Sequence, residues 1–365
     1  LTGGPAGGVA VMEPGDTSGM ALWHPESGRW SRKVMEVIDP ALGEKLPPVQ
    51  RPDRTIGPLS PALAARFGFS PECRIDAGSG DNMYGAIGTG NCEPGMVTVS
   101  LGTSGTAYTF LEEPFIDPTG EVAAFADSTG HHLPLLCVSN MANGYDAWRE
   151  DFGLTHAEFD ELVGRTPVGN EGRILLPWYV GERTPDLPLA TPLYFGFGVS
   201  DFEPRYLARA VLEGHVLNLF DGFDRMPVTA REIRVTGGLS RSPSWCQAIA
   251  DVFQTETVPV EGEGAALGAA IHAAWVWKKE YDGGSPEGEG TPGSAKDEKG
   301  GLPTAEGESN SLGSNLTMLK ELAGRFVTLD EARRTRPGPQ ARPTVLVLRR
   351  LFRALSRRAR GEGSE

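Results

Sequence analysis

Residues 96–110 read MVTVSLGTSGTAYTF, and this stretch decides the fold class. Apolar side chains alternate through 96–101 and return in 106–110, which predicts two strands. The glycine-rich turn between them, residues 102–105, favours an antiparallel hairpin. Glycines and small hydroxyl residues in such a turn expose several backbone N–H groups on one side, as in many phosphate sites. The alternative is an ordinary glycine-containing hairpin without a ligand.

Strands and helices alternate on both sides of this hairpin. Further strands are predicted at 132–141 and 232–238, and residues 17–38 indicate a short strand, a turn and a helix. Ser242 is expected to cap a helix that begins at Pro243. The small residues of 264–277 should let that helix pack very close to a neighbour. The remaining helices are predicted at 61–67, from 142 onward, and at 205–223, and the whole pattern indicates an α/β fold.

The composition and net charge exclude several classes of protein. The 365 residues suffice for two domains, and a net charge of −14 disfavours nucleic acid as a partner. Four cysteines without a C-x-x-C pattern indicate neither a disulfide framework nor a zinc site. No run approaches 18 apolar residues, and no signal-peptide pattern opens the chain. We therefore expect a cytoplasmic protein without a membrane partner.

The densest candidate site is IDAGSGDNMYGAIGTGN, residues 75–91. Asp81 stands between Gly80 and Asn82, where the backbone can come close to a ligand. A carboxylate beside an amide can act as a base and bind a sugar hydroxyl. The alternative is a turn in which Asp81 caps the following helix.

A third candidate is VTGGLSRSPSW, residues 235–245. Gly237 and Gly238 would let a flat ring lie against the backbone, and the following helix N-terminus favours negative charge. The six histidines form no metal-binding pattern, so no metal site of protein side chains alone is expected. A P-loop and a hydrolase nucleophile motif are also missing from the sequence.

The last quarter of the chain differs in composition from the rest. Residues 280–313 hold nine glycines and few large apolar side chains, so we interpret them as a flexible and dispensable insert. Residues 331–365 contain ten Arg and three Glu. Their amphipathic helix either binds an acidic surface or packs on its own domain through an apolar stripe, of which we favour the second. The stripe consists of Leu348, Leu351, Phe352 and Leu355.

Several of these segments together resemble the FGGY family of carbohydrate kinases. They are GSGDN (78–82), SLGTSGT (100–106), LPWYVGERTP (176–185), YLARAVLEG (206–214), GGLSRSPSWCQAIADV from 237, and EGEGAALGAAI (261–271). The resemblance covers roughly residues 10–277 and is greatest to members that phosphorylate xylulose. It implies an actin-like fold of RNase-H-like α/β domains, with ATP and Mg²⁺ as cofactors and a small sugar as substrate. A homodimer is left open.

The resemblance also implies roles for single residues. Asp81 would be the catalytic base, and Asp81 and Asn82 would bind the sugar. The ATP-binding residues would be Gly102, Thr103 and Ser104 at the phosphates, with Gly237, Gly238 and Ser242 toward the adenine and ribose. Gly268 would help to close that pocket. Magnesium would be held mainly through water and a preceding domain.

The resemblance further implies how the chain divides. Residues 1–70 would be the end of an N-terminal domain, 71–277 a complete C-terminal domain, 278–313 the insert, and 314–365 a strand, a helix and the basic tail. The family's Asp-x-G-[ST] phosphate loop is not present before these segments. We therefore expect that these residues alone do not phosphorylate xylulose, and that Met20, Leu22, Trp23 and Trp30 expose apolar surface.

Two other functions remain open. One is a kinase for ribulose, gluconate or glycerol. The other is a nucleotide-binding protein without catalysis, because an actin-like fold by itself does not imply a kinase.

Overall fold

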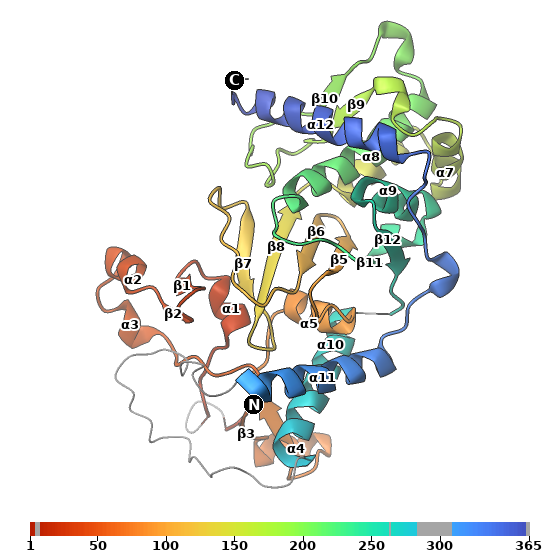
Figure 1. Cartoon of the computed structure of the whole chain (residues 1–365). Coiled ribbons are helices and arrows are strands. Elements are labelled where there is room, and N and C mark those ends of the chain that lie inside the picture. The colour runs from red at the N-terminus through yellow and green to blue at the C-terminus, as the bar shows by residue number, and fades with distance from the viewer. Residues whose placement is uncertain (4–7, 263, 283–308, 363–365) are drawn as a thin grey trace.

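A six-stranded mixed sheet forms the centre of the molecule (Figure 1). The computed structural model describes residues 1–3, 8–262, 264–282 and 309–362. The strand order is β12-β11-β5-β6-β8-β7; β12, β11 and β5 run parallel, and the remaining neighbours are antiparallel. The strands are β5 (Met96–Leu101), β6 (Gly105–Thr109), β7 (Val122–Ala126), β8 (His132–Val138), β11 (Glu232–Thr236) and β12 (Glu256–Pro259). The predicted α/β class and the 96–110 hairpin are confirmed.

Helices cover both faces of this sheet. Val97, Val99 and Leu101 of β5 point into the main core, which also contains residues of the helices on that face. Tyr108, Leu133 and Leu135 point to the opposite face, because successive side chains of a strand alternate. The first face carries α6 (Ala142–Asp151), α7 (His156–Gly164), α8 (Pro204–Phe223), α9 (Pro243–Phe253) and α12 (Arg342–Ala359). The second layer contains α5 (Asp81–Gly88), α10 (Gly264–Trp277) and α11 (Ser309–Phe326).

The helices α5 and α10 touch through their backbones. A Cβ atom added to Gly268 would lie 1.7 Å from the carbonyl oxygen of Tyr84, and one added to Gly88 would lie 1.7 Å from that of Gly264. Only glycine fits at such crossings. The predicted close packing of helix 264–277 is confirmed, and it fixes the position of α5.

The segment before α5 consists of short elements, some beside the edge strand β7 and others near α10 and α11 (Figure 1). They are α1 (Pro14–Ser18), β1 (Trp23–His24), β2 (Arg29–Trp30), α2 (Arg32–Ile38), α3 (Leu42–Lys45), β3 (Thr55–Pro58), α4 (Pro61–Phe67) and β4 (Arg74–Asp76). The expected exposed apolar surface needs correction, because Leu22 is buried and Trp23 and Trp30 cover each other edge to face at 5.6 Å. Met20 is exposed, and so are Val37, Ile38, Phe67 and Phe69.

The boundaries of the predicted insert also need correction. Residues Lys278–Asp282 form a helical turn that continues α10, and α11 begins at Ser309. Glu280 accepts hydrogen bonds from the backbone N–H and the hydroxyl of Thr55, at 2.9 and 2.8 Å, and so joins this turn to β3. The predicted flexibility and dispensability concern mainly residues 283–308, which lie outside the described residues.

The C-terminal helix α12 packs on its own domain. Its side chains Val345, Leu348 and Phe352 are buried in the main core, and Leu351 and Leu355 are partly buried against it. Arg353 donates to Asp221 and Asp224 of the helix α8 region, each at 2.7 Å. The favoured interpretation of the basic tail is therefore confirmed. None of the described helices has the length and apolar character that crossing a membrane requires.

Candidate functional site

The turn between β5 and β6 presents its hydroxyl side chains to solvent. Thr103 and Ser104 are exposed. The carbonyl oxygens of Gly102 and Thr103 accept hydrogen bonds from the backbone N–H groups of Ala142 and Asn143, at 3.0 and 3.4 Å. The start of α6 thus holds the turn in place through its carbonyl groups. An anion could then be bound by N–H groups and hydroxyls on the other side.

The Gly237–Gly238 turn lies directly beside this hairpin. Strand β11 runs parallel to β5, with Thr236 opposite Ser100, so both turns follow the carboxyl ends of neighbouring strands. Gly237 has a φ of 86°, and a Cβ atom there would lie 2.5 Å from the carbonyl oxygen of Leu101. A Cβ atom at Gly238 would meet no atom within 4 Å. The open space at Gly238 fits the expected approach of a flat ring to the backbone.

Ser242 caps α9 as predicted. Its hydroxyl accepts from the backbone N–H of Trp245 at 3.4 Å and donates to Asp160 of α7 at 2.8 Å. The hydroxyl therefore joins two helices, a structural role that the sequence pattern did not reveal. Its expected place near the ribose stays a prediction.

Asp81 is the first residue of α5 and is exposed. Its carboxylate accepts from the backbone N–H of Asn82 at 2.7 Å and from the amide side chain of Asn82 at 3.2 Å. The N-cap residue is Gly80, and no side chain caps this helix. The alternative of Asp81 as a capping residue is therefore wrong, which leaves an exposed carboxylate for chemistry.

One cavity of about 550 Å³ brings two of the predicted motifs together. Asn82 and Ser104 both line it, so the expected sugar ligand and the expected phosphate hairpin share one space. The side chain oxygen of Thr106, a further lining residue, is buried without a hydrogen-bond partner. The other predicted site residues do not line it: Asp81, Gly102, Thr103, Gly237, Gly238 and Ser242. The other lining residues are Thr119, Gly120, Glu121, Ala123, Phe125, Leu135, Cys137, Arg183 and Asp186.

Three charged residues of this cavity escaped the sequence analysis: Glu121, Arg183 and Asp186. Arg183 belongs to the segment LPWYVGERTP and Asp186 directly follows it, and the sequence of this segment indicated only a family resemblance. Nothing in the local spacing of these residues indicates that they approach Asn82, about a hundred positions earlier in the chain.

Glu182 anchors the segment that carries Arg183. Its buried carboxylate accepts hydrogen bonds from the backbone N–H groups of Ser139 and Arg183 and from the side chains of Asn140 and Asn218. Burial raises the pKa of Glu182, while these donors favour its charged form. The segment is thereby fixed to the end of β8 and to α8.

A second buried carboxylate, Glu13, fixes the approach to Asp81. Its oxygens accept from the backbone N–H groups of Gly15 and Asp16, at 2.8 and 2.7 Å, and from the hydroxyl of Ser79 at 3.0 Å. Ser79 stands two residues before Asp81. Helix α1 is thus joined directly to the loop that presents the predicted catalytic carboxylate.

The free energy of unfolding is expected to fall as the pH rises from about 4.5 to about 7. Burial raises the pKa of Glu13 to about 7, so the folded chain holds a proton that the unfolded chain has already released. The glutamine of the variant Glu13→Gln cannot titrate. Between these pH values its free energy of unfolding should therefore rise by up to about 3 kcal/mol relative to that of wild type. Urea unfolding of both proteins at several pH values checks this. A difference that does not vary with pH would contradict it.

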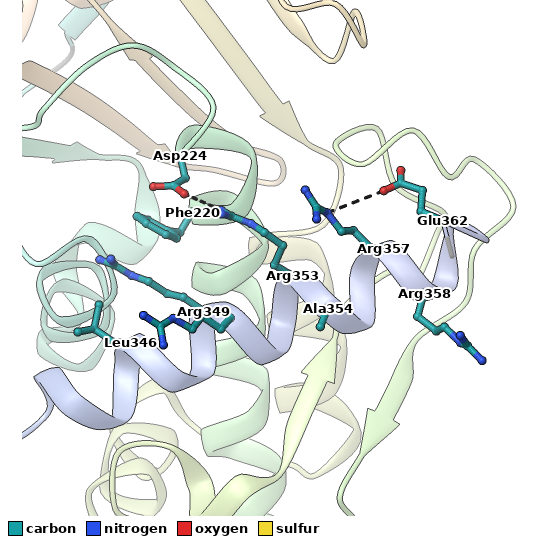
Figure 2. A pocket seen from close by; sticks show the side chains of 10 residues that line it. Phe220, Asp224, Leu346, Arg349, Arg353, Ala354, Arg357, Arg358 and Glu362 are labelled. Atoms are coloured by element: carbon teal, nitrogen blue, oxygen red, sulfur yellow. Dashed lines mark hydrogen bonds and ion pairs between the residues drawn. The ribbon is translucent and has the colours of Figure 1, made fainter. Parts of the chain in front are cut away.

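A larger cavity, of about 700 Å³, lies along α12 (Figure 2). Arg349 lies over the ring of Phe220 at 3.9 Å, Arg353 pairs with Asp224 at 2.7 Å, and Arg357 faces Glu362 at 3.9 Å (Figure 2). None of the predicted site residues lines this cavity. Because these three arginines contact groups within the protein, we place the candidate site in the smaller cavity.

The described residues contain no group of three or more His, Cys, Asp or Glu side chains that could hold a metal ion. A magnesium ion here would therefore be coordinated mainly by phosphate oxygens and water, as is common for this ion.

Most of this chain is similar in sequence to known proteins. Residues 97–277 match the C-terminal domain model of the FGGY family of carbohydrate kinases. A xylulose kinase of Haemophilus influenzae is 36% identical over 275 residues, which cover 74% of this chain and 56% of the relative. The chain therefore spans about half the length of the curated relatives it matches.

Solved structures show the same fold. The ligand-bound xylulose kinase of Lactobacillus acidophilus superposes with a TM-score of 0.79 at 21% identity, over 96% of this chain and 64% of that one. The xylulose kinase of Bifidobacterium adolescentis gives a TM-score of 0.66 at 30% identity, over 74% of this chain and 56% of that one.

Proposed function

Since the chain belongs to the FGGY family of carbohydrate kinases, we propose that it takes part in ATP-dependent phosphorylation of a sugar, converting D-xylulose to D-xylulose 5-phosphate. The observation that carries this proposal is the shared cavity of Asn82 and Ser104. Phosphoryl transfer requires the accepting hydroxyl and the phosphate of ATP to meet in one space. The names of the relatives support xylulose as the sugar.

In this proposal Asp81 acts as the general base. Its exposed carboxylate lies next to Asn82, which orients the sugar, and it takes the proton of the attacking hydroxyl. A positioned base of this kind commonly accelerates a reaction by about 10²–10⁴-fold.

The hairpin and the glycine pair would hold ATP. Backbone N–H groups and the hydroxyls of Thr103 and Ser104 bind the phosphates, and Gly238 leaves room for the adenine. Magnesium, when bound, neutralises the charge of the phosphate oxygens. The protein's own contribution is mainly to position the reacting groups.

The reacting groups of this site are open to water. The side chains of Asp81, Thr103 and Ser104 are all exposed to solvent. Phosphoryl transfer to a sugar must compete with hydrolysis, so kinases close a second protein surface over the cleft. We infer that efficient transfer needs such a cover, and we expect turnover by the 365 residues alone below about 1 s⁻¹.

The test is sugar-dependent ADP release by the purified 365-residue chain, together with binding of ATP and of each sugar. The panel contains D-xylulose, ribulose, gluconate and glycerol. D-xylulose with the highest kcat/KM supports the proposal, and another sugar in that place contradicts the choice of substrate. ATP binding without ADP release for any sugar, even when a second protein surface is supplied to cover the cleft, would instead favour the nucleotide-binding alternative. Binding of neither ATP nor sugar would contradict both.

A further inference from the structure

The segment Gly181–Asp186 presents a single cationic side chain to the cavity. Arg183 is exposed and lines the cavity, while its neighbours Glu182 and Thr184 are buried, at 3% and 1% exposure. A loop that buries the residues on both sides of an arginine displays that arginine in a defined place. Loops held by a rigid scaffold are the usual carriers of binding residues.

Hydrogen bonds hold the backbone on both sides of Arg183. Asn140 donates to the carbonyl oxygen of Gly181 at 2.7 Å, next to the anchored Glu182. On the other side, the hydroxyl of Thr184 donates to the carbonyl oxygen of Cys137 at 3.0 Å, and the backbone N–H of Asp186 donates to Glu121 at 2.8 Å.

Glu121 is itself held by two arginines. Arg225 and Arg360 pair with its carboxylate at 2.6 and 3.3 Å. The negative charge of Glu121 at the cavity is thus already matched by two cations. Within the described part of the chain, no ion pair or hydrogen bond involves the guanidinium group of Arg183. The guanidinium group of Arg183 is therefore available to an anionic ligand, although the exposed carboxylate of Asp186 lines the same cavity.

The chemistry of the cavity indicates what this charge binds. Asn82 marks the expected sugar side of the cavity and Ser104 the expected phosphate side. Thr106 of β6 also lines the cavity, and its buried hydroxyl has no hydrogen-bond partner. Neutral sugar hydroxyls are satisfied by amides and hydroxyls and do not require a cation. A guanidinium group offers five N–H donors in a planar fork that suits phosphate oxygens.

We propose that Arg183 binds the phosphoryl group during its transfer from ATP to the sugar and retains it afterward as the phosphate of the product. In this step the bond between the γ-phosphorus and the oxygen bridging to the β-phosphate breaks, and a bond to the sugar oxygen forms. The hydroxyl proton goes to Asp81. This inference rests on the proposed function, because it concerns the same cavity.

The experiment compares wild type with Arg183→Ala, Arg183→Lys and Arg350→Ala. Arg350 is the matched control, an exposed arginine on α12 without a hydrogen bond or ion pair in the described chain. Titration calorimetry of the 365-residue chain measures Kd for D-xylulose and for D-xylulose 5-phosphate. Wild type and Arg350→Ala should bind the phosphorylated sugar at least about 10-fold more tightly than the free sugar, and Arg183→Ala should lose this preference. Arg183→Lys should retain part of it.

Each outcome decides the inference. An unchanged preference in Arg183→Ala, an equal loss of both affinities, or no preference in wild type would overturn it. Failure of the proposed function is distinguishable, because it appears as missing xylulose-dependent ADP release in wild type even when a covering protein surface is supplied. A phosphate preference that depends on Arg183 would then still assign this cavity to a phosphorylated ligand.

Discussion

In an enzyme that also provides the cover over the cleft, Asp81→Ala is expected to lower kcat for sugar phosphorylation by about 100-fold or more, while the Kd for ATP changes little. The carboxylate is exposed at the start of α5 and contacts only its neighbour Asn82 among the hydrogen bonds found in the described chain. Its loss should therefore remove the base without disturbing the fold. Initial rates of ADP release at saturating sugar, and calorimetric titration with ATP, provide the two values.

Two variants sharpen this test. Asp81→Asn keeps the shape of the side chain but cannot take a proton, so its kcat should fall as far as that of the alanine variant. Asp151→Ala removes an exposed carboxylate from the end of α6, outside the cavity, and should retain wild-type activity. If Asp81→Ala kept more than half of the wild-type rate, the assignment of the base would be wrong.

Gly268→Ala should destabilise the chain by at least about 3 kcal/mol or prevent folding. The added methyl group would lie 1.7 Å from the carbonyl oxygen of Tyr84 and 2.8 Å from the backbone nitrogen of Gly88. Neither helix backbone can yield as a flexible side chain would. The two helices must separate, and they would shift Asp81 at the start of α5 with them. Thermal and urea unfolding measure the effect.

Gly264→Ala is the matched control, because it makes the same change in the same helix one turn earlier. The nearest atom to its Cβ would be the methyl group of Thr89 at 3.6 Å, which is ordinary van der Waals contact. Gly264 is the first residue of α10, where alanine fits at least as well as glycine, so this variant should unfold no earlier than wild type. An equal loss of stability in both variants would mean that the close contact of Gly268 with α5 has no special role.

The elements that the sequence predicted well depend on local rules. Alternating apolar residues placed β5 at 96–101, and Ser242 with Pro243 placed the start of α9. Pro61–Phe67 forms a helix as expected. The boundaries were less accurate, since β8 ends at Val138 and β6 already begins at Gly105. End residues depend on which strand lies alongside, and periodicity does not contain that information.

Local sequence patterns also predicted only part of the candidate site. Glycines and small polar residues at turns indicated Asp81, Asn82 and the hairpin, because few backbone conformations accommodate such sequences. The same reasoning suggested a capping role for Asp81, which the structure contradicts, and it did not show that the hydroxyl of Ser242 joins α9 to Asp160. Local turn chemistry identifies the residues of a site but not all of their partners.

By itself, the sequence determined the α/β class, the hairpin, the close packing of helix 264–277 and the turn residues of the predicted site. These features can be recognised from local sequence patterns: alternating apolar residues, glycines at turns and small residues along one helix. Only the tertiary structure decided that Arg183 lines the cavity of Asn82, that Glu13 binds Ser79, and that Arg360 pairs with Glu121. These partners lie about 65 to 240 positions apart. Their approach depends on how sheet and helices pack together, and no local pattern of charge or hydropathy encodes that arrangement.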